Sequence, residues 1–181
     1  MPALTWLLAP VVVGAVVATR WPAWRRRREH AADASAQLRR AVLARTLSEE
    51  LATGAPDTVT AVVMDWNIGG DVVATLAAMQ DGTTSLYFSK GGGILGAGSY
   101  ENVREASTRF RTTAREVRNS FKPTDDFSLP GANHTRFFLV TRDATLATIS
   151  VANSVLVDRE HPLAVLGAAG QAVITQVRKV K

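Results

Sequence analysis

The chain has 181 residues, of which 21 are Lys or Arg and 16 are Asp or Glu, so its formal net charge is +5. It contains no cysteine, which excludes disulfides and thiolate metal sites. Residues 1–30 hold five Arg and one Glu, so the remainder carries 16 basic and 15 acidic residues. This near balance leaves no broad basic surface for nucleic acid, and no nucleic-acid partner is expected.

An apolar run without a charged residue, residues 3–19, opens the chain, and arginines follow it at once. Extended to residue 24 the run is long enough, at ~1.5 Å per residue, to cross a bilayer. The pattern predicts a transmembrane anchor over residues 1–24, at the inner (cytoplasmic) membrane, with the following domain in the cytoplasm. The residues expected to meet the membrane and its lipids are Trp6, Trp21, Trp24, Arg20, Arg25, Arg26, Arg27 and Arg28.

A cleaved signal peptide and an interfacial helix are the two alternatives for this segment. A cleaved signal peptide would carry its basic residues before the apolar run, whereas here they come after it. An interfacial helix would need a polar face, which residues 3–18 lack. The arginine-rich flank is typical of a juxtamembrane segment beside anionic lipid.

Residues 25–56 are predicted as this basic juxtamembrane segment followed by a helix over residues 29–53. Apolar residues recur there at helical spacing, and Gly54 and Pro56 end the pattern. The pattern leaves open whether the helix is a stalk or packs on the domain that follows.

Residues 57–181 are predicted to form one domain that begins with three strands, residues 58–66, 71–80 and 83–89. The second of these segments, residues 71–80, contains three alanines, so a helix is the alternative prediction for it. Asp81-Gly82 between two apolar runs predicts a two-residue type I′ hairpin.

The second half of the domain is predicted to contain two helices and two strands. An amphipathic helix is predicted over residues 100–121, then strands over 135–141 and 145–151, then a helix that Pro162 opens. The order α-βββ-α-ββ-α predicts an α+β fold in which helices flank an antiparallel sheet of about five strands.

The glycine-rich segment 89–99 follows a strand, precedes a helix and contains G-x-G-x-x-G. Backbone N–H groups in such a loop can cradle an anion. The alternative is a flexible crossover from the sheet to the helix. The candidate ligand-binding residues are Ser89, Lys90, Gly91, Gly93, Gly96, Gly98 and Ser99.

Other polar residues form no recognisable site. His30, His134 and His161 are scattered, without metal-ligand spacing, and nothing marks a nucleophile elbow or a triad. No catalytic residue, metal or cofactor is therefore expected. Asp125 and Asp126 are interpreted as a solvated loop tip.

The segment MDWNIGGDVVATLAAMQDGTTSLYFSKGGGILGAGS resembles one that recurs in uncharacterised bacterial proteins. The element order over residues 57–181 is also similar to roadblock, longin and profilin-like folds. The resemblance to roadblock domains implies dimerisation and a small GTPase as partner. Roadblock domains place two strands before the central helix and three after it, whereas three and two are predicted here.

These patterns favour a membrane-anchored, non-enzymatic, self-associating domain that binds protein partners. The alternative is a sensor that binds a small anion or nucleotide through residues 89–99.

Overall fold

The computed structural model describes residues 29–44 and 58–180. The predicted anchor over residues 1–24, its flanking arginines, and the second part of the predicted helix 29–53 lie outside these described residues.

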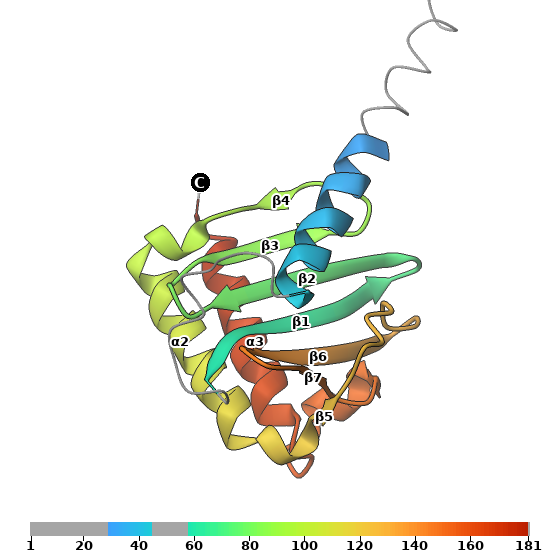
Figure 1. Ribbon diagram of the computed structural model, residues 1–181, viewed down its shortest axis with the longest axis vertical. Coiled ribbons are helices and arrows are strands. Elements are labelled where there is room, and N and C mark those ends of the chain that lie inside the picture. Colours follow the sequence, from blue (N-terminus) through green and yellow to red (C-terminus); the bar gives the residue numbers. More distant parts are fainter. Residues whose placement is uncertain (1–28, 45–57, 181) are drawn as a thin grey trace, which may run out of the picture.

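The described domain is α+β and is built on one antiparallel sheet (Figure 1). Its strands run in the order β4-β3-β2-β1-β6-β7-β5, and β8 pairs with β6. β1 lies at the centre of this order, between β2 and β6. The eight strands are β1 (Val59–Gly69), β2 (Val72–Met79), β3 (Thr84–Phe88), β4 (Gly93–Ile94), β5 (Lys122–Pro123), β6 (His134–Thr141), β7 (Thr145–Ala147) and β8 (Val151–Ala152).

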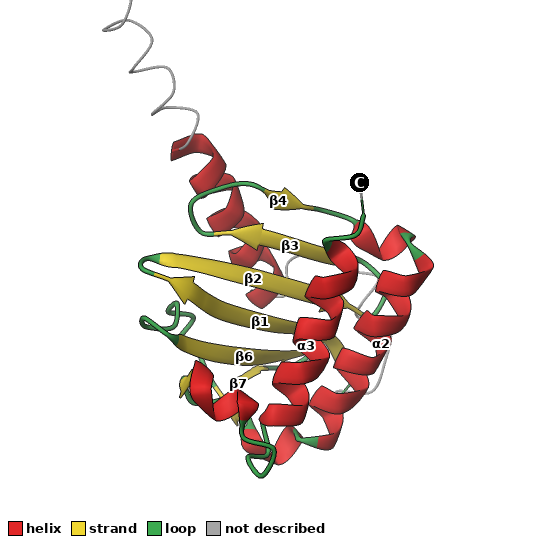
Figure 2. Cartoon of the chain, turned by 180° about the vertical axis from the view of Figure 1, so that it is seen from behind, coloured by secondary structure: helices red, strands yellow, loops and turns green. Residues whose placement is uncertain are grey.

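Helices cover both faces of the sheet. α2 (Glu101–Glu116) and α3 (Ala164–Val177) lie side by side on one face (Figure 2). The helix formed by residues 29–43 crosses the opposite face (Figure 1). It therefore packs on the domain, which answers the question that its sequence left open.

The side chains of β1 alternate between the two faces of the sheet, which explains why each face has its own apolar core. Val62 and Met64 belong to the core under α2 and α3, whereas Ala61 and Val63 belong to a second core that includes Val42 and Leu43 of helix 29–43. Successive side chains of a strand point to opposite faces, so a strand that is apolar at every position needs a cover on both sides. Within residues 58–180 there are also three short 3-10 segments: η2 (Ala97–Ser99), η3 (Arg118–Ser120) and η4 (Asn153–Val157).

The structure corrects the prediction of a transmembrane helix. Among residues 29–44 and 58–180, no helix is long and apolar enough to cross a membrane. α2 has 16 residues and α3 has 14, so they span only ~24 and ~21 Å against a bilayer core of ~30 Å. The prediction of a single-pass protein of the inner (cytoplasmic) membrane is corrected with it.

The strand count and one turn are also corrected. The sheet has eight strands rather than about five, because three two-residue strands, β4, β5 and β8, add to the predicted set. Asp81-Gly82 is not a type I′ turn. Gly82 has a φ of 90°, but Asp81 is not among the described residues with positive φ. Hydrogen bonds from Gly82 N–H to Met79 O and from Met79 N–H to Thr83 O instead close a three-residue loop.

Candidate functional site

A row of polar side chains crosses the sheet on the face that helix 29–43 covers. Arg136 of β6 is paired with Asp65 of β1, Asp65 with Thr75 of β2, and Thr75 with Tyr87 of β3. Directly opposed residues of antiparallel strands point to the same face, so the register alone aligns these four side chains. Asp65, Thr75 and Tyr87 are all buried, with exposures of 0%, 3% and 4%.

The carboxylate of Asp65 is fully paired. Arg39 donates from Nε to Asp65 Oδ2 over 2.8 Å, and its Nη2 donates to the same oxygen. The Thr75 hydroxyl donates to Oδ1 over 2.6 Å. A buried charge is tolerated when it is both paired and hydrogen-bonded, as this one is.

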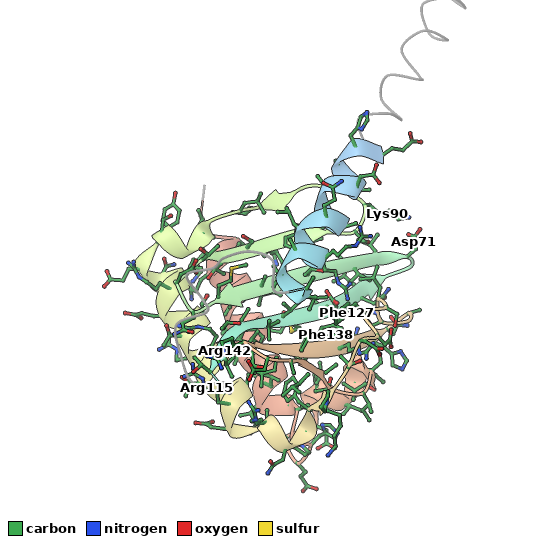
Figure 3. The ribbon with its side chains drawn as sticks, viewed as in Figure 1. Asp71, Lys90, Arg115, Phe127, Phe138 and Arg142 are labelled. Atoms are coloured by element: carbon green, nitrogen blue, oxygen red, sulfur yellow. The ribbon has the colours of Figure 1, made fainter. Side chains whose placement is uncertain are left out.

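Two aromatic rings and a carbonyl complete the surroundings of Arg39. Its Nη1 donates to the carbonyl of Phe127 over 2.7 Å, and its guanidinium carbon lies 5.4 Å from the centre of the Phe138 ring. Phe127 and Phe138 lie next to one another (Figure 3), with ring centres 6.3 Å apart. The Arg136 guanidinium also lies over Phe138, at 5.0 Å. These contacts hold Arg39 in one orientation.

A pocket of about 360 Å³ opens beside the ion pair. Its walls come from helix 29–43, from β2 and β3, and from the loop that follows β5. The lining residues are Ser35, Ala36, Arg39, Arg40, Thr75, Tyr87, Ser89, Phe127 and Leu129.

The Tyr87 hydroxyl is the unusual group of this lining. Its oxygen is buried and makes no hydrogen bond within the described part of the chain. Burial raises the pKa of this hydroxyl, the Asp65 carboxylate raises it further, and the Arg39 cation lowers it. The group is therefore a neutral phenol at neutral pH and can donate a hydrogen bond.

The glycine-rich segment has a different arrangement. The N–H groups of Ser89, Gly91, Gly96 and Ser99 donate to neighbouring protein oxygens. A Cβ on Gly93 would lie 2.4 Å from the Leu86 carbonyl oxygen, and one on Gly98 would lie 1.8 Å from that of Gly82. These two glycines therefore permit close backbone packing at the edge of the sheet.

Of the seven predicted ligand-binding residues, only Ser89 lines the pocket beside the ion pair. Lys90 instead pairs with Asp71 at the exposed end of the sheet (Figure 3). Ligand binding by the whole segment stays a prediction. The predicted membrane-contacting residues, Trp6, Trp21, Trp24, Arg20, Arg25, Arg26, Arg27 and Arg28, lie outside the described residues.

The remaining polar residues that the sequence singled out have local roles. His161 Nδ1 accepts a hydrogen bond from the Leu163 N–H just before α3. Asp125 and Asp126 are exposed, and Asp126 also accepts hydrogen bonds from the Ser128 N–H and from Arg136. Within the described ranges, no group of three His, Asp or Glu side chains could hold a metal ion.

Sequence reasoning did not identify Arg39, Asp65, Thr75 or Tyr87 as site residues. One signal could have found Asp65: it is the single charged residue in the apolar run 58–66. A charge within a central strand requires a partner, which directs attention to cations on the covering helix.

Comparison of the chain with protein families, with characterised proteins and with solved structures gave no match. The resemblances to uncharacterised bacterial proteins and to roadblock, longin and profilin-like folds therefore stay predictions. The function is argued below from the site alone.

Proposed function

We propose that this domain binds a small molecule in the pocket between helix 29–43 and the sheet. The observation that carries the proposal concerns Tyr87, which lines the pocket and whose hydroxyl oxygen is buried without a partner among the described residues. A buried hydroxyl left unpaired costs about 1–3 kcal/mol. A ligand that hydrogen-bonds to it recovers this free energy.

The rest of the pocket supports the proposal. Its volume of about 360 Å³ lies within the usual range of ligand sites, roughly 300–1,000 Å³. Its lining combines the apolar residues Ala36, Phe127 and Leu129 with six polar residues, so it offers both apolar contact and hydrogen-bonding groups. The Arg39–Asp65 pair forms a fixed wall, because both oxygens of the carboxylate are engaged.

The chain contains two tyrosines, which gives a direct test. Tyr87 is buried in the pocket, and Tyr100, at 46% exposed, serves as an internal control. The full chain would be labelled with ¹³C-tyrosine and titrated with benzamide, benzoate, benzylamine and phenyl phosphate, and with octanamide, octanoate and octylamine. We expect at least one probe to shift the Tyr87 signal saturably and to leave the Tyr100 signal in place.

The Tyr87→Phe variant assigns the two signals. If none of these seven probes shifts the Tyr87 signal saturably, the proposal of a small-molecule site is wrong.

A second candidate is a self-associating, non-enzymatic protein-interaction domain. Large apolar side chains exposed on neighbouring elements favour it: Val157 of η4 is 81% exposed, and Val165 of α3 is 60% exposed. Such exposure is common at interfaces. A small GTPase as the partner has only the architectural resemblance to roadblock domains behind it.

Sedimentation velocity of the full chain tests this candidate. A concentration-dependent dimer that Val157→Ser and Val165→Ser together dissociate would support it. Leu95→Ser, which changes an apolar residue elsewhere that is about as exposed as Val165, should leave the dimer intact. A monomer at every concentration would exclude self-association.

A further inference from the structure

We infer that the ligand of this pocket is a singly charged organic anion, a carboxylate attached to an apolar body. The inference rests on the proposed function and adds the chemical class of the ligand. It follows from three properties of the lining: which polar groups are unpaired, the sum of the charges, and the character of the remaining surface.

Both of the unpaired polar side chains of the lining can donate hydrogen bonds. Ser35, Arg39, Thr75 and Ser89 all make side-chain hydrogen bonds to the protein. Arg40 and Tyr87 are the two polar lining residues whose side chains make none within the described residues. The Arg40 guanidinium carries donors and no acceptor, whereas the protonated Tyr87 phenol carries one donor beside its acceptor oxygen, so a ligand acceptor satisfies both residues. The complementary ligand therefore presents acceptors.

The charges of the lining leave one positive charge uncompensated. Asp65 and Arg39 form an ion pair and cancel each other. Arg40 is exposed, lines the same pocket and makes no ion pair within the described part of the chain. One guanidinium balances one carboxylate, and the two groups can form a bidentate pair. A ligand ammonium group would be repelled by Arg40. A phosphate dianion would pair one of its two negative charges with Arg40 and leave the other without a cation.

The apolar part of the lining specifies the body of the ligand. Ala36, Phe127 and Leu129 face the pocket, and Leu129 is 45% exposed. An apolar group placed against these residues is removed from water together with Leu129, which stabilises the complex in proportion to the area buried. At ~30 Å³ for each water, the pocket holds roughly a dozen water molecules, so the body is limited to about that many non-hydrogen atoms.

The test compares four probes of one shape and different charge: benzoate, benzamide, benzylamine and phenyl phosphate. Their affinities for the full chain would be measured by saturation-transfer NMR on the ring protons of each probe. We expect benzoate to bind about tenfold or more tightly than benzamide, because a charge-assisted hydrogen bond is stronger than a neutral one. Benzylamine should bind most weakly.

Three variants locate the interaction. Arg40→Gln should reduce benzoate affinity to that of benzamide, and Tyr87→Phe should weaken both probes. Arg109→Gln, which removes an exposed arginine of α2 on the opposite face of the sheet, should change neither. The circular dichroism melting curve of each variant checks that it is folded.

The outcomes separate the two proposals. If benzamide or benzylamine binds as tightly as benzoate, if phenyl phosphate binds most tightly, or if Arg40→Gln leaves benzoate affinity unchanged, the ligand class is wrong and the small-molecule site stands. If none of the four probes binds and the octyl compounds also fail to shift the Tyr87 signal, the site itself is wrong and the ligand class falls with it.

Discussion

Arg39 and Asp65 join helix 29–43 to the middle of the sheet through an ion pair whose carboxylate is wholly buried. Arg39 Nε lies 2.8 Å from Asp65 Oδ2, and the exposures of the two side chains are 12% and 0%. Because Asp65 lies on the central strand β1, the pair positions the helix relative to both β2 and β6. It therefore also positions Ser35 and Arg40, which line the pocket from the same helix.

Removing one member of this pair should be costly. Arg39→Met leaves the Asp65 carboxylate buried without a cation, and we expect the free energy of unfolding to fall by about 3–5 kcal/mol. Replacing both members, as Arg39→Met with Asp65→Leu, should recover most of this loss, because no charge then remains buried. Urea denaturation followed by circular dichroism measures both effects.

The exposed pair of Lys90 and Asp71 provides the control, since its side chains are 58% and 77% exposed. Lys90→Met should cost less than about 1 kcal/mol, because solvent screens a pair at the surface. An Arg39→Met variant no less stable than Lys90→Met would show that the buried pair does not hold the helix on the sheet.

Tyr87→Phe should leave the unliganded protein as stable as before or raise its free energy of unfolding by about 1 kcal/mol. A hydrogen-bonded buried tyrosine loses about 1 kcal/mol of stability when it is changed to phenylalanine, but the Tyr87 hydroxyl has no partner within residues 29–44 and 58–180. Tyr100→Phe is the matched control on an exposed residue, and it should have almost no effect. A loss above 1 kcal/mol in Tyr87→Phe would reveal a hydrogen bond to this hydroxyl in solution.

The sequence predicted the long elements of the fold because their signals are local. Runs of β-branched residues predicted β1 and β6, and a stripe of apolar residues predicted α2. The predicted ends of these elements differ from the observed ends by up to five residues. The short strands have no such signal. β4 consists of Gly93 and Ile94, and it forms because a glycine without a Cβ can approach Leu86 and Tyr87 closely.

The candidate site could not be predicted for a related reason. Arg39 and Asp65 are 26 residues apart, and their contact depends on which face of the sheet the helix covers. Thr75 and Tyr87 join them only through the register of three strands. The hairpin between β2 and β3 was predicted at the right place, but its turn type was wrong, because Asp81-Gly82 fits a two-residue turn and also the three-residue loop that forms.

Asp126 should contribute to the pH dependence of stability in acid. Hydrogen bonds from Ser128 and then from Arg136 lower its pKa from an ordinary 3.8 to about 2. Because the pKa of Asp126 is lower in the folded state than in the unfolded state, the carboxylate stabilises the fold at pH values above its unfolded pKa. This contribution is lost as the pH falls from about 4 to about 2. The ¹³C carboxyl signal of Asp126 should titrate near pH 2, and Asp126→Asn should flatten the stability curve in this window. A titration midpoint near 3.8 would contradict the contacts with Ser128 and Arg136.

Gly98 should tolerate no side chain, because the backbone of Gly82 occupies the space. A Cβ on Gly98 would lie 1.8 Å from the Gly82 carbonyl oxygen, and backbone atoms cannot move aside cheaply. We expect Gly98→Ala to lower the free energy of unfolding by about 3 kcal/mol or more. Gly96→Ala is the control from the same segment: its φ is 69° and nothing lies within 4 Å of the added Cβ, so strain of only about 1–2 kcal/mol is expected. Urea denaturation of both variants measures the difference. Equal stabilities would mean that the glycine-rich segment does not pack against the β2–β3 hairpin and is open enough to hold an anion.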